Sequence, residues 1–235
     1  MTTPLRTGTV ALAAAMGIAL AGCSSDTSGD AVAEQETTSS EATSSSAPSS
    51  PAGPTETSPA AAPQQTIAEY LRENNVEQTP VAPGAPGSPK VDLPQLPGWE
   101  DAGPKAPEGA YSAVLFADPS MAQDPPMIST FMFKLTGNVD PAGIFAAAPA
   151  ELTTLPGFEY LGDGRESELS GFDAYQFGGA YTRDGVKRMI AQKTVFIPAE
   201  GGGYLLQLTA DGTEDQIGPL LDATSTIDEQ TVITP

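Results

Sequence analysis

The residue types that most often carry out catalysis are scarce in this chain. Its 235 residues include no histidine, which excludes a Ser-His-Asp triad and a histidine-based metal site. Its single cysteine, Cys23, excludes an internal disulfide and a cysteine-based zinc site. No Gly-x-Ser-x-Gly elbow, P-loop or dinucleotide fingerprint is present either. We therefore expect no catalytic residue, no metal and no cofactor.

Carboxylates are the remaining candidates for chemistry, and they form two clusters. The clusters are Asp163, Glu166 and Glu168, and Asp211, Glu214 and Asp215. Paired carboxylates can hydrolyse glycosides, although runs in polar turns or at helix starts are ordinarily solvated acidic faces. Neither spacing fits a helix–loop–helix calcium site. We interpret both clusters as solvated faces, and a carboxylate-based hydrolase of glycans or lipids stays as an alternative.

Cys23 stands where a lipid can be attached. Arg6 gives a positive start, residues 9–20 are mostly apolar, and Leu20-Ala21-Gly22 precede the cysteine. This pattern is typical of a secretory signal, and the apolar run is too short for a bilayer of about 30 Å. The Leu-Ala-Gly-Cys string resembles the bacterial lipobox, which implies a diacylglyceryl group on Cys23 and cleavage before it. The alternatives are an uncleaved anchor or an ordinary secretory signal with a chance cysteine.

We therefore predict a lipoprotein signal peptide at residues 1–22 and a tether at residues 23–64. The tether is rich in Ser, Thr, Ala and Pro and has no aromatic residue, so it cannot bury enough apolar area to fold. Its Ser/Thr-Pro clusters can also serve as glycosylation sites. The predicted location is the cell membrane, lipid-anchored on its extracytoplasmic face, and the folded domain is predicted at residues 65–235.

Two further sets of residues are candidates for binding. Aromatic side chains that alternate along predicted strands would line a ligand or partner groove if one sheet face lay open under a helix. The candidates for this groove are Trp99, Phe131, Tyr175, Phe177 and Tyr181. The alternative is that both sheet faces are ordinary core, which is also the preferred reading of Trp99.

Basic residues gather near one predicted hairpin. They are Arg183, Lys187, Arg188 and Lys193. This local positive spot would meet an anionic headgroup or an acidic partner, or else protect an edge strand from aggregation. The whole chain carries a net charge of −20, with 10 basic and 30 acidic residues, so nucleic acid is a poor partner.

Helices and antiparallel strands must position these residues. Capping boxes at Thr66–Glu69 and Thr213–Gln216 predict two helix starts, and Asp140 with Pro141 predicts a third, which Pro149 interrupts. In the last helix one buried face is predicted, formed by Ile217, Leu220, Leu221, Thr224 and Ile227.

The strand signals lie between these helices. Strands are predicted at residues 111–116, 127–135, 172–181, 186–197 and 204–208. Asp184-Gly185 and Gly201-Gly202-Gly203 are the predicted turns of the hairpins, and the proline-rich residues 76–98 are predicted to cross the surface. This order of elements predicts an α+β fold, with helices packed on an antiparallel sheet.

Long strings of the folded part resemble one known family. They include DPPMISTFMFKLTGNVDP from Asp124, SGFDAYQFGGAYTRDG from Ser170 and IAQKTVFIP from Ile190. On these strings the chain resembles the LpqN/LpqT lipoproteins of mycobacteria and related actinobacteria. The resemblance implies a PsbP-like α-β-α sandwich, a place in the mycolate-rich cell envelope and no catalytic motif.

Three functions remain open at this stage. The leading one is a non-enzymatic envelope lipoprotein that binds envelope lipid or a mycolate-export permease complex, as the resemblance implies. The second is the carboxylate-based hydrolase, and the third is a structural or antigenic surface protein without a dedicated ligand. An apolar groove would favour the first, and a cleft with two facing carboxylates the second.

Overall fold

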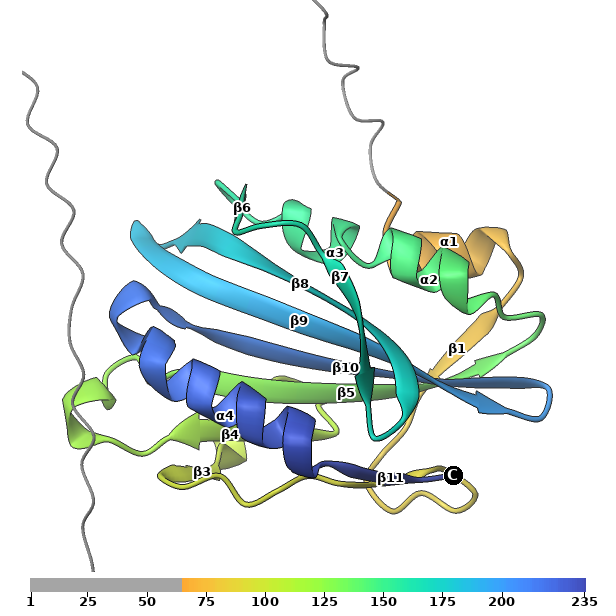
Figure 1. Cartoon of the computed structure of the whole chain (residues 1–235), viewed down its shortest axis with the longest axis horizontal. Helices are drawn as coiled ribbons and strands as arrows, with labels where there is room; N and C mark the ends of the chain where they lie inside the picture. Colours follow the sequence, from red (N-terminus) through yellow and green to blue (C-terminus); the bar gives the residue numbers. More distant parts are fainter. Residues whose placement is uncertain (1–64) are drawn as a thin grey trace, which may run out of the picture. The chain divides into compact units, whose positions relative to one another are not determined.

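The structure, a computed structural model, describes residues 65–235 (Figure 1). The predicted signal peptide, Cys23 and the predicted tether lie outside the described residues. The helices are α1 (Ile67–Glu73), η1 (Gly103–Lys105), η2 (Pro119–Met121), α2 (Pro141–Ala147), α3 (Ala150–Thr153), η3 (Glu214–Gln216) and α4 (Ile217–Gln230). The strands are β1 (Glu77–Pro80), β2 (Lys90–Asp92), β3 (Trp99–Asp101), β4 (Ser112–Phe116), β5 (Met127–Thr136), β6 (Glu159–Tyr160), β7 (Arg165–Leu169), β8 (Phe172–Arg183), β9 (Val186–Ala199), β10 (Gly202–Thr213) and β11 (Val232–Thr234).

One antiparallel sheet organises the described part of the chain. Its path is β3-β4-β5-β10-β9-β8-β6, with β1 also paired to β5 and β7 also paired to β8. The long strands β8, β9 and β10 follow one another through tight hairpins, so neighbours in sequence are neighbours in space. The last strand, β11, pairs with β2 in a separate two-stranded ladder.

Helices cover both faces of this sheet. On one face, called here the α4 face, Leu220, Ala223 and Ile227 pack on alternate residues of β5, β8, β9 and β10 (Figure 1). On the other, the α1–α3 face, Ile67 and Ile144 join the opposite set of strand residues in a second core cluster. The predicted α+β class is therefore confirmed, while the PsbP-like relationship stays a prediction.

Short sequence signals set the ends of these elements. Thr66 and Glu69 form the predicted capping box of α1, and Asp140 accepts a hydrogen bond from the Ala142 N–H at the start of α2. Pro149 separates α2 from α3, as its missing N–H requires. In the β8–β9 turn Asp184 and Gly185 have φ values of 54° and 79°, which is the backbone that an Asp-Gly hairpin turn needs.

The buried face of α4 differs from the prediction. Leu220 and Ile227 are buried as expected, but Ala223 completes the face, and Ile217 and Leu221 are exposed. Apolar residues spaced three and four apart can be drawn along either of two neighbouring stripes of this helix. Only one of these stripes packs on the sheet, and the spacing alone does not say which. The short strands β1, β2, β3, β6, β7 and β11 also fall where no strand was predicted.

Candidate functional site

A cleft opens between α4 and the exposed half of the α4 face. Its volume is about 470 Å³, a size in the range of small-molecule sites. We call it the α4 cleft. Residues from α4, from β5, β7, β8, β9 and β10, and from the segment that joins β6 to β7 line it. Those used below are Leu161, Asp163, Arg165, Gln176, Gly178, Ala191, Lys193, Ala210, Leu221, Thr224, Ser225 and Asp228.

Small residues on three neighbouring strands form the floor of the cleft. Gly178 pairs with Ala191, and Ala191 pairs with Ala210, so the three lie in one row across β8, β9 and β10. Side chains this small leave a hollow between the sheet and the helix. Ala191 is exposed although it lies in a central strand, and a Cβ at Gly178 would come within 2.7 Å of the Ile190 carbonyl oxygen.

A second stripe of α4 forms one wall. Leu221, Thr224, Ser225 and Asp228 recur at helical spacing beside the stripe that packs on the core. Leu221, which is 61% exposed, faces the same cleft as Leu161, which is 60% exposed. Two exposed leucines therefore flank an opening with an uncharged floor.

An ion pair closes the polar end of the cleft. The ammonium of Lys193 on β9 donates a hydrogen bond of 2.6 Å to the carboxylate of Asp228 on α4. Lys193 also lies 3.5 Å from the Glu168 carbonyl oxygen, and its side chain is only 10% exposed. Gln176 and Arg165 continue the row from Lys193 across β8 and β7, and Arg165 forms no ion pair within residues 65–235. This end can donate and accept hydrogen bonds.

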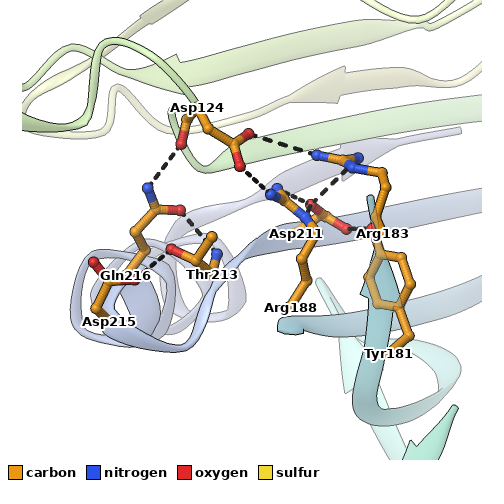
Figure 2. A network of polar contacts seen from close by, with 8 residues as sticks. All are labelled: Asp124, Tyr181, Arg183, Arg188, Asp211, Thr213, Asp215 and Gln216. Atoms are coloured by element: carbon orange, nitrogen blue, oxygen red, sulfur yellow. Dashed lines mark hydrogen bonds and ion pairs between the residues drawn. The ribbon is translucent and has the colours of Figure 1, made fainter. Parts of the chain in front are cut away.

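A separate polar network lies on the α1–α3 face. The guanidinium of Arg188 is buried and donates hydrogen bonds to Asp211 and Asp124 (Figure 2). Arg183 also faces both carboxylates, at 3.5 Å from Asp124 and 3.9 Å from Asp211. Two arginines and two carboxylates thus balance one another in charge, which is what allows Arg188 to be buried.

Tyr181 and Gln216 extend this network in two directions. The Tyr181 hydroxyl donates to Asp211, and burial together with this hydrogen bond raises the pKa of Tyr181 to about 12. The Gln216 side-chain amide donates a hydrogen bond of 2.7 Å to the Asp124 carbonyl oxygen. It also accepts a hydrogen bond from the Thr213 N–H, which completes the predicted capping box (Figure 2). The network therefore joins β8, β9 and β10 to the segment before β5 and to the start of α4.

The five aromatic candidates do not share one groove. Trp99 packs against the α4-face core with its ring 5.5 Å from that of Phe116. The other four alternate onto the α1–α3 face, where Phe177 and Tyr181 are buried in the core and Phe131 is half-buried. Tyr175 lines an open groove of about 1040 Å³ beside α2, together with Phe145 and carboxylates such as Glu166. Their role in binding stays a prediction.

The four basic candidates all face carboxylates. Arg183 and Arg188 belong to the network of Figure 2, and Lys187 lies 3.4 Å from Glu214 and 3.9 Å from Glu159. Lys193 points to the face of the sheet opposite to that network, into the α4 cleft. The hairpin thus brings only Arg183 and Arg188 together, and Lys187 lies on the same face of the sheet as Lys193, because the side chains of a strand alternate between its faces.

The structure also divides the two predicted acidic clusters. Asp163 lines the α4 cleft, whereas Glu166 and Glu168 line the groove beside α2. Asp211 belongs to the arginine network, and Glu214 faces Lys187. Within residues 65–235 no three such side chains stand together in a way that would hold a metal ion.

Of the residues that line the α4 cleft, the sequence analysis named Phe177, Lys193 and Asp163 as candidates for function and missed the others. The signal that would have revealed the cleft is a set of small residues at matching positions of three consecutive strands, Gly178, Ala191 and Ala210. That signal requires the register of both hairpins. Once the turns at residues 184–185 and 200–201 are placed, the register follows from them.

Comparison with known proteins places the chain in a family. A family model described as "Probable lipoprotein LpqN" matches residues 63–234. The chain belongs to this LpqN family, as the sequence resemblance predicted. "Lipoprotein LpqN" of Mycobacterium tuberculosis is 46% identical to it over 94% of this chain and 95% of that protein. The crystal structure of LpqN involved in cell envelope biogenesis of Mycobacterium tuberculosis is 44% identical, covers 74% of this chain and 100% of that one, and superposes with a TM-score of 0.69.

Membership in the LpqN family is consistent with the chemistry of the described residues. The relatives found are named as lipoproteins, and their names contain no enzymatic activity. Within residues 65–235 no helix has the length and apolar character needed to cross a membrane.

Proposed function

We propose that this chain is a lipid-anchored, non-enzymatic lipoprotein of the cell envelope that binds an envelope lipid in the α4 cleft. The observation that carries this proposal is the floor of small residues under α4, flanked by two exposed leucines. A hollow of this kind gains free energy when an apolar chain fills it, at about 25 cal/mol per Å² of apolar surface buried. Lys193, Gln176 and Asp228 then supply hydrogen bonds for a polar headgroup at the other end.

The anchor is the second part of the proposal. The Leu20-Ala21-Gly22-Cys23 string and the names of the relatives support diacylglyceryl attachment at Cys23, and a location at the extracytoplasmic face follows. A lipoprotein held there encounters envelope lipids without crossing the membrane again. The family resemblance adds assembly or trafficking of mycolate lipids, beside a mycolate-export permease complex, and a PsbP-like α-β-α sandwich fold.

Filling the cleft tests the lipid site directly. In Ala191→Phe an aromatic ring would occupy the floor, while Ala199→Phe places the same ring on an exposed alanine of the same strand, outside the cleft. The mature protein is purified from its own envelope, and bound lipid is measured by native mass spectrometry and by extraction. We expect lipid on the wild-type protein and on Ala199→Phe and its loss from Ala191→Phe.

Three results would contradict the proposal. An empty wild-type protein would favour a structural or antigenic role without a dedicated ligand. Equal lipid on both variants would place the lipid outside the cleft. Conversion of the extracted lipid by the purified protein, abolished by a change at Asp163, would favour the hydrolase alternative instead.

A further inference from the structure

Three of the six large apolar side chains that are exposed within residues 65–235 gather beside the start of α4. They are Leu161, Ile217 and Leu221, and we call this surface the apolar end. The other three lie elsewhere: Tyr160 packs edge-on against Phe158 on the α1–α3 face, Val186 points to that same face, and Val232 lies in the ladder that β11 forms with β2. Single exposed leucines are ordinary on a protein surface, whereas a contiguous group marks an interaction site.

Ion pairs and the cleft establish that these residues are neighbours. Lys187 lies 3.9 Å from Glu159 and 3.4 Å from Glu214, so it joins the strand before Leu161 to the segment before Ile217. Leu161 and Leu221 line the same cleft, and Ile217 lies one helical turn before Leu221. In Figure 1 the tip of the β8–β9 hairpin, β6 and the start of α4 all lie toward the left end of the sheet.

The rim of the apolar end is negatively charged. Exposed carboxylates adjoin each of its segments: Glu159, Asp163, Glu214, Asp215 and Asp222. The cations beside them are fewer, and Lys187 is already shared between two of these carboxylates. A second copy of this chain would bring the same negative rim against this one, and an anionic lipid surface would be repelled in the same way.

We propose that the apolar end is a docking surface for a basic amphipathic segment of another envelope protein. Apolar side chains of that segment would cover Leu161, Ile217 and Leu221, and its lysines or arginines would pair with the carboxylate rim. The partner would then sit across the opening of the α4 cleft, because Leu161 and Leu221 flank that opening. This inference stands on the exposed surface and does not require that the cleft holds a lipid.

Two matched synthetic peptides test the chemistry of the partner. One is an amphipathic helix of leucine and lysine, and the other carries glutamate in place of each lysine. Binding of the full-length mature protein to each is measured by fluorescence anisotropy at two salt concentrations. We expect binding of the lysine peptide only, weakened by salt because the rim contacts are solvent-exposed.

Variants of the protein locate the surface. Leu161→Ser with Leu221→Ser should weaken binding of the lysine peptide by at least about tenfold, as truncation of central apolar anchors does. Val232→Ser removes an equally exposed apolar side chain elsewhere and should leave binding unchanged. All the altered side chains are exposed, so thermal unfolding should report intact folds for both variants.

Several outcomes would overturn the inference. They are equal binding of both peptides, insensitivity to the double substitution, preferential binding to phosphatidylcholine vesicles, or self-association of the mature protein that the double substitution abolishes. Ala191→Phe separates this inference from the proposed lipid site, since it should abolish bound lipid and leave peptide binding intact. A protein that retains its lipid but does not bind the lysine peptide would contradict the docking surface and leave the proposed lipid site standing.

Discussion

At the scale of single residues, the most constrained group is the Tyr181 hydroxyl. It donates to Asp211, which also accepts hydrogen bonds from Arg188. If the Tyr181 hydroxyl lost its proton, a buried phenolate would face the Asp211 carboxylate with no hydrogen bond between them. The arginines nearby favour the ionised form, but burial and Asp211 outweigh them, and the pKa of Tyr181 rises to about 12.

The pH dependence of this group has a definite sign. Because the pKa is higher in the folded than in the unfolded chain, its contribution to stability is complete below pH 10 and is lost as the pH rises towards 12. Ultraviolet titration of the folded protein should therefore show a late tyrosine phase near pH 12. Tyr181→Phe should remove that phase and flatten the fall of unfolding free energy between pH 10 and 12. A late phase that survives in Tyr181→Phe would assign it to another tyrosine.

At the scale of elements, the position of α4 decides whether the cleft exists. Leu220, Ala223 and Ile227 hold one stripe of the helix on the core, and the Lys193–Asp228 pair ties the neighbouring stripe to β9. The pair is asymmetric, because the Lys193 side chain is 10% exposed and that of Asp228 is 41% exposed. Removing Asp228 therefore leaves a charged group that is nearly buried, whereas removing Lys193 leaves one that water reaches.

This asymmetry predicts unequal costs for the two substitutions. Asp228→Asn leaves a nearly buried ammonium without its counter-ion and should lower the free energy of unfolding by about 2 kcal/mol. Lys193→Met leaves a carboxylate that water reaches, and should cost less than about 1 kcal/mol. Urea denaturation of the two variants measures both. Equal losses would mean that the ammonium of Lys193 is better hydrated than its burial implies.

The elements also show how far sequence reasoning reaches. Caps, the Asp184-Gly185 turn and the alternating strands predicted α1, α2, the three long hairpin strands and the α+β class, because those signals are local. The short strands β6 and β7 and the stripe of α4 that faces the core depend on what packs against them, which no local pattern contains. The cleft belongs to this second kind. Its floor is Gly178, Ala191 and Ala210. These three small residues are far apart in the sequence, and only the register of the strands shows that they are neighbours.

At the scale of the whole molecule, charge and attachment act together. The net charge of −20 on the whole chain favours solubility and repels anionic surfaces, so long-range attraction cannot hold the protein at a membrane rich in anionic lipid. The proposed acyl chains on Cys23 would supply that attachment instead. A single chain binds only marginally, and two give stable anchoring, at about 0.8 kcal/mol for each buried CH₂.

Cys23→Ala tests whether the acyl chains, and not the folded domain, hold the protein at the membrane. It removes the proposed thioether and leaves the folded domain unaltered. The wild-type mature protein should partition into the detergent phase of a Triton extraction and carry a diacylglyceryl group on its first residue by intact-mass analysis. The variant should appear in the aqueous phase or the culture medium, with its thermal unfolding unchanged.

The predicted tether sets what the anchored domain can reach. Its roughly 40 residues would span roughly 35 Å as a flexible coil and roughly 140 Å at full extension, so the α4 cleft and the apolar end would meet partners well above the bilayer surface. A Cys23→Ala protein that stayed in the detergent phase would show that the domain itself holds the membrane. Because the domain is acidic, that contact would have to be apolar, and Leu161→Ser with Leu221→Ser in the Cys23→Ala background would then release it.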